Sequence, residues 1–425
     1  MVNSRIAKVY AEIINSELVE ATGCTEPIAL ALAGAKAKEV LGAMPDKVDA
    51  YCSGNIIKNV KGVVVPNSGG LKGIDTAVLL GMVGGDPNVG LQVVSKVDDE
   101  DRERLKNELE RIAFSCHLAQ DVPTLYIRIE AYKGEHSVIV EIQVTHSNFT
   151  KIVRNGEVLL SSECKDDAYP GPDKSLLNVK DIFDYASNFD LSDVKETIKR
   201  QIDDNTAISN EGLKNAWGQE VGRTLLKACG KEDIRIRARA AAAAGSDARM
   251  NGCPMAVVIN SGSGNQGMTV SLPVIEYAKE MKADEDRTIR ALVLANLIAL
   301  HQKRYIGYLS AYCGAVSAAA GAGCGICFLK GGSYENMCDV ITNTIASIGG
   351  MVCDGAKSSC AGKISLAVEA ALLALDMAMD KKCYQCGEGM VKKDIESTIE
   401  AYGRMAAKGM KSTDIEILNI MLEDR

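Results

Sequence analysis

A stretch rich in glycine, alanine and serine, residues 312–363, constrains this chain more than any other part. It carries Cys313 in YCGAVSAAAGAG, and Cys353 and Cys360 in GMVCDGAKSSCAGKI. Small residues let backbone segments approach closely, and glycine supplies the turns that a bulky inorganic ligand requires. Three thiols in such surroundings favour a binding site for a metal or cluster. The alternative for any single cysteine is a small core residue, because free cysteine is among the most buried residue types.

The composition and charge of the chain exclude several classes of protein. Its 425 residues are enough for two or three domains with buried cores. The formal net charge is −8 and no basic block is present, which argues against a nucleic-acid partner. The longest apolar run, residues 364–379, is too short to span a bilayer, and no signal peptide opens the chain. We therefore expect a cytoplasmic protein without a membrane partner, whose 14 cysteines stay reduced.

Alternating apolar and polar residues predict one clear β region. The segments TLYIRIEAY, SVIVEIQVTHS and FTKIVRNGEVLL alternate in this way, and Asn155-Gly156 is a strong hairpin signal. We expect successive antiparallel strands with one face toward solvent. Helical patterns at 76–83 and 98–113 precede these strands, so residues 46–190 should form one α+β unit.

Helical periodicity dominates the rest of the chain. Several segments are apolar on most faces, which is typical of helices buried inside a bundle. Examples are residues 210–229 and an Ala-rich helix that Gly245 should cap. The expected fold class is α+β: a mostly helical catalytic domain, residues 1–45 and 191–425, with an inserted smaller α/β domain, residues 46–190, that contains an antiparallel sheet.

Cys24 stands at a predicted helix start. Pro27 and an Ala/Leu run follow it, and proline is favoured in the first turn of a helix. The dipole and free N–H groups at a helix N-terminus lower the pKa of a thiol there and make it reactive. We therefore take Cys24 as a candidate catalytic thiol. A cysteine wedged in a tight turn is the alternative.

Two loops rich in serine, asparagine and glycine offer hydrogen-bond donors to a small anion. They are Asn67-Ser68-Gly69-Gly70 and INSGSGNQG, residues 259–267, whose polar candidates are Ser261, Ser263 and Asn265. Hydroxyls, amides and open backbone N–H groups suit a carboxylate or phosphate, especially where a helix begins just after the loop. An ordinary surface turn is the alternative for each loop, since glycine and asparagine are turn residues.

Two C-x2-C pairs, Cys324/Cys327 and Cys383/Cys386, provide further thiols. Paired motifs of this type can form a zinc site of four thiolates, but these pairs are farther apart than in the usual zinc ribbon. The first pair falls in an apolar helical segment and the second in an exposed turn between helices. Their roles stay open.

Five blocks of the sequence together resemble one enzyme family. They are ATGCTEPIALALAGAKA (21–37), VPNSGG (65–70), INSGSGNQG (259–267), YCGAVSAAAGAGCGI (312–326) and MVCDGAKSSCAGKI (351–364). In this order and over nearly the whole chain, they resemble the L-cysteine desulfidases, a family related to the iron–sulfur L-serine dehydratases. The spacings between the cysteines of the last two blocks are also similar to the desulfidase pattern.

The resemblance implies a [4Fe-4S] cluster held by Cys313, Cys353 and Cys360, with one iron left open, and Cys24 as the acid–base residue. It also implies that the two Ser/Asn loops hold an amino-acid substrate, and Lys357, beside the cluster cysteines, is expected to pair with its carboxylate. The expected enzyme is an oxygen-sensitive carbon–sulfur lyase, an L-cysteine desulfidase that converts L-cysteine and water to pyruvate, ammonia and hydrogen sulfide. A homodimer is expected.

Three alternative functions stay open at this point. Serine dehydration on the same cluster differs from desulfidation only in the leaving group. A pyridoxal-phosphate eliminase would need a buried lysine to form the Schiff base. It would also leave the group of three cysteines without a role. A non-catalytic iron–sulfur or thiol sensor explains the cysteines but not the Ser/Asn loops or Cys24, and no DNA-binding element supports a regulator.

Overall fold

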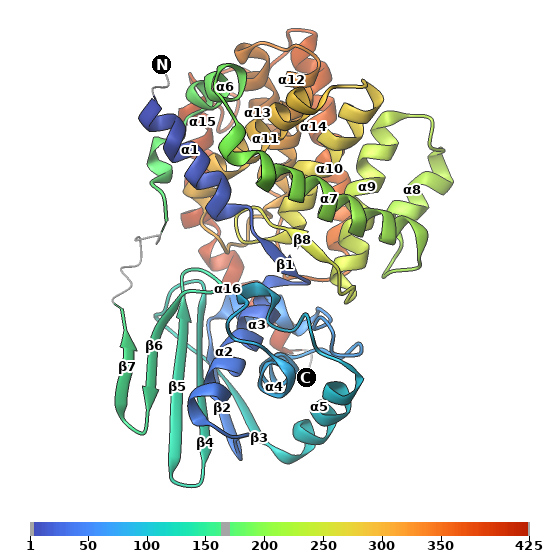
Figure 1. Cartoon of the computed structure of the whole chain (residues 1–425). Helices are drawn as coiled ribbons and strands as arrows, with labels where there is room; N and C mark the ends of the chain where they lie inside the picture. The colour runs from blue at the N-terminus through green and yellow to red at the C-terminus, as the bar shows by residue number, and fades with distance from the viewer. Residues whose placement is uncertain (1–3, 163–170, 424–425) are drawn as a thin grey trace.

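The computed structural model describes residues 4–162 and 171–423, which form two lobes (Figure 1). The sheet lobe comprises residues 24–162, and the helical lobe comprises residues 4–22 and 171–410. The last helix, α16 (Lys411–Glu423), lies where the lobes meet and packs against α3 (Gly54–Lys61) of the sheet lobe.

The sheet lobe is built on a mixed sheet whose strands lie in the order β3-β2-β4-β5-β6-β7. Neighbouring strands are antiparallel except for the parallel pair of β2 and β3. Besides α3, its elements are α2 (Thr25–Leu41), β2 (Lys47–Cys52), α4 (Ile74–Gly84), η1 (Gly90–Gln92), α5 (Asp99–Arg111), β3 (Ala113–Leu118), β4 (Tyr126–Lys133), β5 (His136–Gln143), β6 (Phe149–Arg154) and β7 (Glu157–Ser161).

Burial along β4 follows the period of two that the sequence predicts. Ile127, Ile129 and Ala131 are fully buried, and the residues between them are half-buried. The hairpin between β6 and β7 turns at Asn155 and Gly156, whose φ angles of 51° and 85° lie in the left-handed region that such a turn requires. The expected antiparallel strands are therefore confirmed. The mostly exposed edge strand β3 has no comparable pattern and was not predicted.

Helices α2 and α4 cross closely at two glycines. An added Cβ at Gly34 would lie 2.3 Å from the carbonyl oxygen of Val78, and one at Gly81 would lie 1.9 Å from that of Ala31. This crossing and the packing of α2 on β4 and β5 fix α2 in the sheet lobe. The division of the chain into domains stays a prediction, but it assigned residues 1–45, and so α2, to the helical part.

The helical lobe packs long apolar helices side by side, and the short strands β1 and β8 pair antiparallel at its lower edge in Figure 1. The α+β fold class is confirmed. The elements are α1 (Ser4–Glu17), β1 (Glu20–Thr22), η2 (Lys174–Leu176), α6 (Val179–Asn188), α7 (Ser192–Lys214), α8 (Val221–Cys229), α9 (Ile234–Met250), β8 (Ala256–Val258), α10 (Gly264–Glu280), α11 (Glu285–Ile306), α12 (Ala315–Leu329), α13 (Tyr334–Ile348), α14 (Cys360–Met379), α15 (Ile395–Arg404) and η3 (Met405–Gly409).

Two local expectations are wrong. Residues 210–229 are not one helix, because the chain leaves α7 after Lys214 and enters α8 only after Glu220, whose φ angle is 52°. Gly245 does not cap a helix but lies inside α9. An added Cβ there would lie 2.5 Å from Met268 Sδ, so glycine at this position allows α10 to pack closely on α9.

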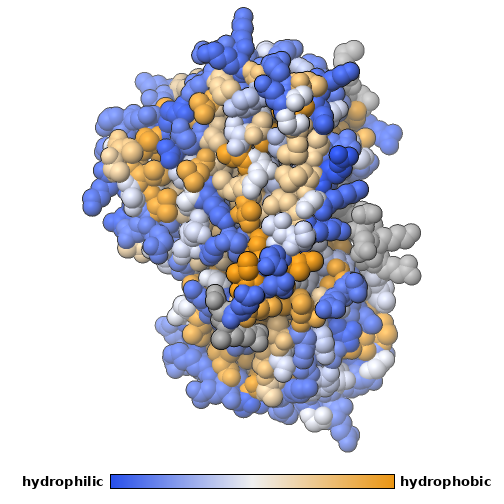
Figure 2. Space-filling model, turned by 180° about the vertical axis from the view of Figure 1, so that it is seen from behind, coloured by the Kyte–Doolittle hydropathy of each residue, from blue (hydrophilic) through white to orange (hydrophobic). Residues whose placement is uncertain are grey.

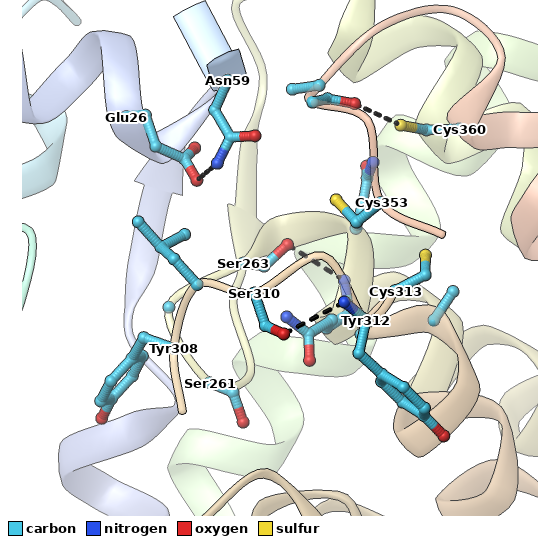
Figure 3. A pocket seen from close by; sticks show the side chains of 18 of the residues that line it. Glu26, Asn59, Ser261, Ser263, Tyr308, Ser310, Tyr312, Cys313, Cys353 and Cys360 are labelled. Atoms are coloured by element: carbon cyan, nitrogen blue, oxygen red, sulfur yellow. Dashed lines mark hydrogen bonds between the residues drawn. The ribbon is translucent and has the colours of Figure 1, made fainter. Parts of the chain in front are cut away.

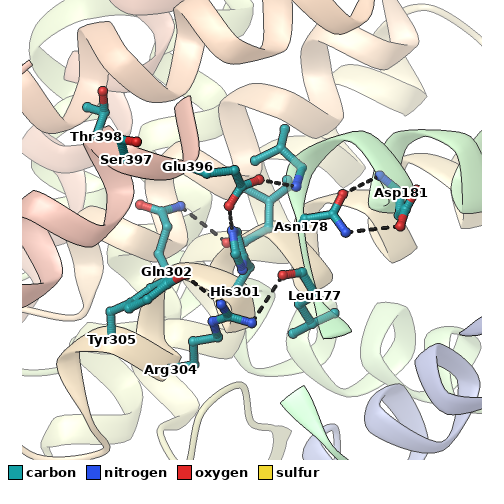
Figure 4. Close-up of polar contacts among 12 residues, drawn as sticks. Leu177, Asn178, Asp181, His301, Gln302, Arg304, Tyr305, Glu396, Ser397 and Thr398 are labelled. Atoms are coloured by element: carbon teal, nitrogen blue, oxygen red, sulfur yellow. Dashed lines mark hydrogen bonds and ion pairs between the residues drawn. The ribbon is translucent and has the colours of Figure 1, made fainter. Parts of the chain in front are cut away.

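A partly buried group of polar residues joins α6, α11 and α15 (Figure 4). The Nε2 atom of fully buried His301 lies 2.6 Å from Glu396 Oε2, and the backbone N–H of Val179 donates to Glu396 Oε1 at 2.7 Å. Burial tends to raise the pKa of Glu396, but the contacts with His301 and Val179 outweigh it, so the pKa is lowered. The group holds the C-terminal part of the lobe on the bundle.

Apolar side chains are visible near the middle of the rear face of the molecule (Figure 2). Exposed large apolar residues in the described ranges include Leu366 and Leu373 on α14 and Ile415 and Ile420 on α16. Across residues 4–162 and 171–423, none of the helices combines the length and apolar character needed to cross a membrane.

Candidate functional site

A cavity of about 100 Å³ lies between the two lobes (Figure 3). One buried water needs roughly 10–15 Å³ of such a space, so several waters or a small organic molecule fit. The sheet lobe supplies Cys24, Glu26, Asn59 and His146, and the helical lobe supplies Ser261, Ser263, Asn265, Lys303, Tyr308, Tyr312, Cys313, Cys353, Cys360 and Lys363, among others.

The three predicted cluster cysteines open onto this cavity. Tyr312 and Val352 form an isolated antiparallel bridge, and the backbone N–H groups of Cys313 and Cys353 donate across it at 2.9 and 2.6 Å. Because side chains alternate along extended segments, these two thiols lie on the same face of the bridge. Cys360 is the first residue of α14 and lines the cavity from a third direction.

The chemistry of these thiols fits a metal cluster. Burial raises the pKa of Cys313 to about 12, and the neighbouring Cys353 adds to the shift. Burial also raises the pKa of Cys360, so ionising Cys313 and Cys360 requires positive charge of the kind that a metal supplies. No group of three or more His, Cys, Asp or Glu side chains in the described ranges is arranged to hold a metal ion. An iron–sulfur cluster is held by one thiolate for each ligated iron, so thiols from three separate segments are suitable ligands for it.

Cys24 is the N-cap residue of α2, as predicted, and its side chain is buried. The thiol donates to Glu26 Oε2 at 3.1 Å. Burial and the Glu26 carboxylate raise the pKa of the thiol well above its ordinary value, and the Arg249 guanidinium opposes them. The expected lowering of this pKa by the helix dipole is wrong, because burial and a neighbouring anion outweigh the dipole.

Glu26 is the centre of the polar contacts on the sheet-lobe side. Besides Cys24, it accepts hydrogen bonds from Thr25 Oγ1 at 3.1 Å and Asn59 Nδ2 at 3.0 Å, and His146 Nε2 lies 3.9 Å from its Oε1. Burial tends to raise the pKa of Glu26, but His146 and Cys24 outweigh it and lower the pKa to about 2. Glu26 is therefore a charged carboxylate in direct contact with the thiol.

His146 reaches the cavity from the turn between β5 and β6. Val144, two residues earlier, has a φ angle of 70°, a strained conformation for a β-branched residue. The imidazole packs against Gly262, where an added Cβ would lie 3.0 Å from His146 Cε1. His146 is buried, and its Nε2 has no hydrogen-bond partner among the residues that the structure describes. Strain and an unsatisfied buried nitrogen together indicate a functional role.

The loop INSGSGNQG forms one wall of the cavity and leads into α10, as predicted. Ser263 is the N-cap residue of α10, and its hydroxyl accepts from the backbone N–H of Gln266. Ser261, with a φ angle of 50°, donates to Asn260 Oδ1 at 3.0 Å. With Asn265, these two serines present hydroxyl and amide groups to the space beside the cysteines.

Three residues predicted to bind substrate, Asn67, Ser68 and Lys357, do not line this cavity. Ser68 Oγ donates at 3.0 Å to a carbonyl of its own turn, and Asn67 Nδ2 donates at 2.8 Å to Val94 O. Lys357 Nζ pairs with Asp354 at 2.5 Å. Their polar groups are used in contacts with other protein atoms and are not presented to the cavity.

Two other lysines, Lys303 and Lys363, stand at the cavity instead. Burial lowers the pKa of Lys303 to about 8, although the nearby Cys353 and Cys313 oppose this shift. Lys363 Nζ donates to Val352 O at 2.7 Å, close to the cysteine bridge, and also pairs with Asp354, which it shares with Lys357. Positive charge beside the thiols favours an anion in the cavity.

Arg249 is a buried cation behind the cavity wall. Its Nε donates to Gly23 O at 2.9 Å, and its Nη1 donates to Asn265 Oδ1 at 3.2 Å. Its Nη2 lacks a hydrogen-bond partner within the described ranges. Arg249 thus connects the turn before Cys24 with the polar loop of the helical lobe.

Sequence reasoning missed Glu26, His146, Lys303 and Arg249. Glu26 follows Cys24 by two residues inside the first sequence block, and this position could have identified it as a residue of the site. The other three come from a hairpin turn and from helices, where no local pattern distinguishes them from ordinary polar residues.

The two C-x2-C pairs lie away from the cavity. Cys324 and Cys327 are buried in α12, whereas Cys383 is half-buried and Cys386 is exposed. Within the described ranges these thiols form no group that could hold a metal ion.

The fold and the cavity define an α+β protein that brings a set of thiols and a set of acid–base side chains to one small-molecule site. Residues 88–419 match the model of the serine dehydratase alpha chain, and the chain belongs to that family. The resemblance to the iron–sulfur dehydratases and desulfidases is thereby confirmed at the level of the family, which places the chain among the lyases.

Proteins similar to this chain over its whole length are known from several bacteria. A UPF0597 protein of Lachnoclostridium phytofermentans is 49% identical over 415 residues, which cover 98% of this chain and 99% of that protein. One from Finegoldia magna is 46% identical over 417 residues, 98% of this chain and 100% of that protein. One from Fusobacterium nucleatum subsp. nucleatum is 45% identical over 424 residues, 98% and 99% of the two chains.

Proposed function

We propose that this protein is a [4Fe-4S]-dependent L-cysteine desulfidase that converts L-cysteine and water to pyruvate, ammonia and hydrogen sulfide. The observation that carries the proposal is the meeting of Cys313, Cys353 and Cys360 with Cys24 at one cavity of about 100 Å³. The spacing of the three thiols and their neighbourhood in the sequence resemble the desulfidases, which favours cysteine as the substrate.

Cys313, Cys353 and Cys360 would hold the cluster. With three protein thiolates, a four-iron cluster keeps one iron open, and this iron supplies a Lewis acid for the departing sulfur. Lys303 and Lys363 lie beside the thiols and would offset the negative charge of the ligated cysteines.

Proton transfer would be the task of the sheet-lobe residues. Removal of the Cα proton and cleavage of the C–S bond give aminoacrylate, which hydrolyses to pyruvate and ammonia. Cys24 is a protonated thiol as it stands, so it can act as base only after its proton moves to a neighbour. Glu26 accepts the hydrogen bond of the thiol at 3.1 Å, but its lowered pKa makes it a poor final proton acceptor, so the neighbouring His146 would take the proton. General base catalysis of this kind contributes about 10²–10⁴ in rate.

The polar loop of the helical lobe would orient the substrate. Ser261, Ser263 and Asn265 offer hydroxyl and amide groups for the α-amine and carboxylate, and Lys303 or Lys363 offers the charge for the carboxylate. Asn67, Ser68 and Lys357 would support these walls from outside the cavity.

Serine dehydration is the second candidate, because the family is described by the serine dehydratase alpha chain. Loss of water from L-serine needs the same proton removal and the same open iron, and differs in the leaving group. A homodimer and a cytoplasmic location stay predictions for either activity.

Parallel assays with L-cysteine and L-serine on the anaerobically reconstituted protein test the proposal. Equal amounts of sulfide and pyruvate from cysteine, lost on exposure to air, are expected. Pyruvate from serine alone would replace the desulfidase with the dehydratase, and no product from either amino acid would overturn the proposed function.

A further inference from the structure

Helix α3 lies between the loop of a cluster cysteine and the C-terminal helix. On one side, Lys58 Nζ donates to the carbonyl oxygen of Cys353 at 3.4 Å. The backbones also touch there, since an added Cβ at Gly355 would lie 2.4 Å from Lys58 O. On the other side, an added Cβ at Gly54 would lie 2.7 Å from Leu418 Cδ2 on α16. The three segments form one packed stack.

The centre of this stack is a buried ion pair. The side chain of Lys58 is 1% exposed and pairs with Asp414 of α16, which is 18% exposed. Asn55 Nδ2 donates to the second carboxylate oxygen of Asp414 at 2.7 Å. A buried pair of this kind adds little net stability, because the cost of removing both charges from water offsets their attraction. Stability alone therefore does not explain why this ion pair is present.

The same helix contacts the other side of the cavity. Asn59, next to Lys58, donates to Glu26 Oε1 at 3.0 Å, and Glu26 accepts from the thiol of Cys24. A small shift of α3 would thus move the backbone of Cys353 and the partner of Cys24 together. No residue of α16 lines the cavity, so α16 acts on it through the elements that it contacts, and α3 is the one that carries Lys58.

We propose that Lys58 is a positioning residue for the cluster ligand Cys353, and that Asp414 on the C-terminal helix holds Lys58 in place. This inference rests on the proposed function, because it assumes that Cys353 holds a cluster. Lys58 fixes the carbonyl of Cys353, and the amide of the same residue is fixed by the bridge to the Cys313 segment. With both backbone groups held, the thiol stays directed into the cavity. The C-terminal helix is then part of the cluster site.

Linkage makes the coupling measurable in the unaltered protein. If α16 and α3 hold Cys353, binding of the cluster must in turn stabilise α3 and α16 by the same free energy. Hydrogen–deuterium exchange of the cluster-free and the cluster-loaded chain should therefore slow in residues 54–61 and 411–423 on loading, and stay unchanged in α8, far from the site. Equal exchange of α16 in the two forms would overturn the proposal.

A charge-free replacement separates positioning from folding. The double variant K58M/D414L removes both charges and fills the space with apolar side chains, which buried ion pairs commonly tolerate. We expect it to fold but to lose iron to a chelator about 10–100-fold faster than the parent, the range seen for residues that support metal ligands. Lys61→Met is the matched control, because Lys61 also contacts α16, at Met421 O, but does not contact Cys353.

The outcomes distinguish this inference from the proposed function. A parent chain that takes up no iron–sulfur cluster would overturn both. A parent that holds the cluster, with K58M/D414L holding it equally long, would overturn the positioning role alone. If the double variant does not fold, the exchange comparison on the parent decides the matter.

Discussion

The two walls of the cavity differ in chemistry and in how the chain builds them. The helical lobe supplies thiols, hydroxyls and lysines, carried on glycine-rich loops and helix starts. The sheet lobe supplies Cys24, Glu26, Asn59 and His146, carried on the start of α2, on α3 and on a strained hairpin turn. The first wall is suited to holding a cluster and a substrate, and the second to moving protons. We therefore expect substitutions in one wall to impair the binding of the cluster and the substrate, and substitutions in the other to impair proton transfer.

The largest effect should follow from removing a thiol of the helical wall. Cys353→Ser should abolish activity and reduce the iron bound after reconstitution, because supporting residues already cost about 10–100-fold in metal affinity and a ligand should cost more. Iron content and the cluster absorbance provide the measurement. Cys386→Ser, at an exposed thiol away from the cavity, is the control and should match the parent.

On the sheet wall, Cys24→Ala should lower kcat by about 10²–10⁴, the contribution of a general base. The cluster absorbance and iron content should stay at the parental level, because Cys24 belongs to the proton-transfer wall. A variant that lost the cluster along with its activity would mean that the two walls are not separate.

Glu26→Gln tests the charge in the middle of the sheet wall, and its effect depends on pH. The pKa of Glu26 is lowered from 4.5 to about 2, so its carboxylate stabilises the folded state above pH 4.5 and this contribution is lost as the pH falls toward 2. Urea unfolding between these pH values should therefore show a smaller loss of stability in Glu26→Gln than in the parent. Glu12→Gln, at an exposed site on α1, is the control and should keep the parental slope.

The smallest effect should come from Ser68→Ala, outside the cavity. Its hydroxyl holds its own turn, so the substitution should cost about 1 kcal/mol of unfolding free energy and leave kcat/KM within about twofold. Ser263→Ala, on the cavity wall, should instead lower kcat/KM for L-cysteine. If Ser68→Ala impaired catalysis more than Ser263→Ala, the assignment of residues to the site would be wrong.

Much of the helical wall could be predicted from the sequence, because its residues lie in short blocks of cysteine, serine and glycine. The antiparallel strands β4 to β7 and the helix start at Cys24 also follow from local patterns. The composition of the sheet wall could not be predicted in full, since His146 depends on a hairpin turn that reaches across to the other lobe. Asn67 and Ser68 show the opposite error: a polar, glycine-rich turn looks like a binding loop, but its own hydrogen bonds use its donors.

The pKa of Cys24 shows a similar limit. Its place at a helix start was predictable, but the pKa of the thiol depends on burial and on Glu26, which only the assembled structure brings together. Local sequence therefore identifies which residues meet at the cavity better than it identifies their protonation.

The most direct test of the three-thiol cluster is the Mössbauer spectrum of the protein reconstituted with ⁵⁷Fe, recorded with and without L-cysteine. We expect a [4Fe-4S] spectrum in which one iron differs from the other three and changes when the substrate is added. Four irons that do not respond to L-cysteine, or an absence of cluster iron, would contradict it.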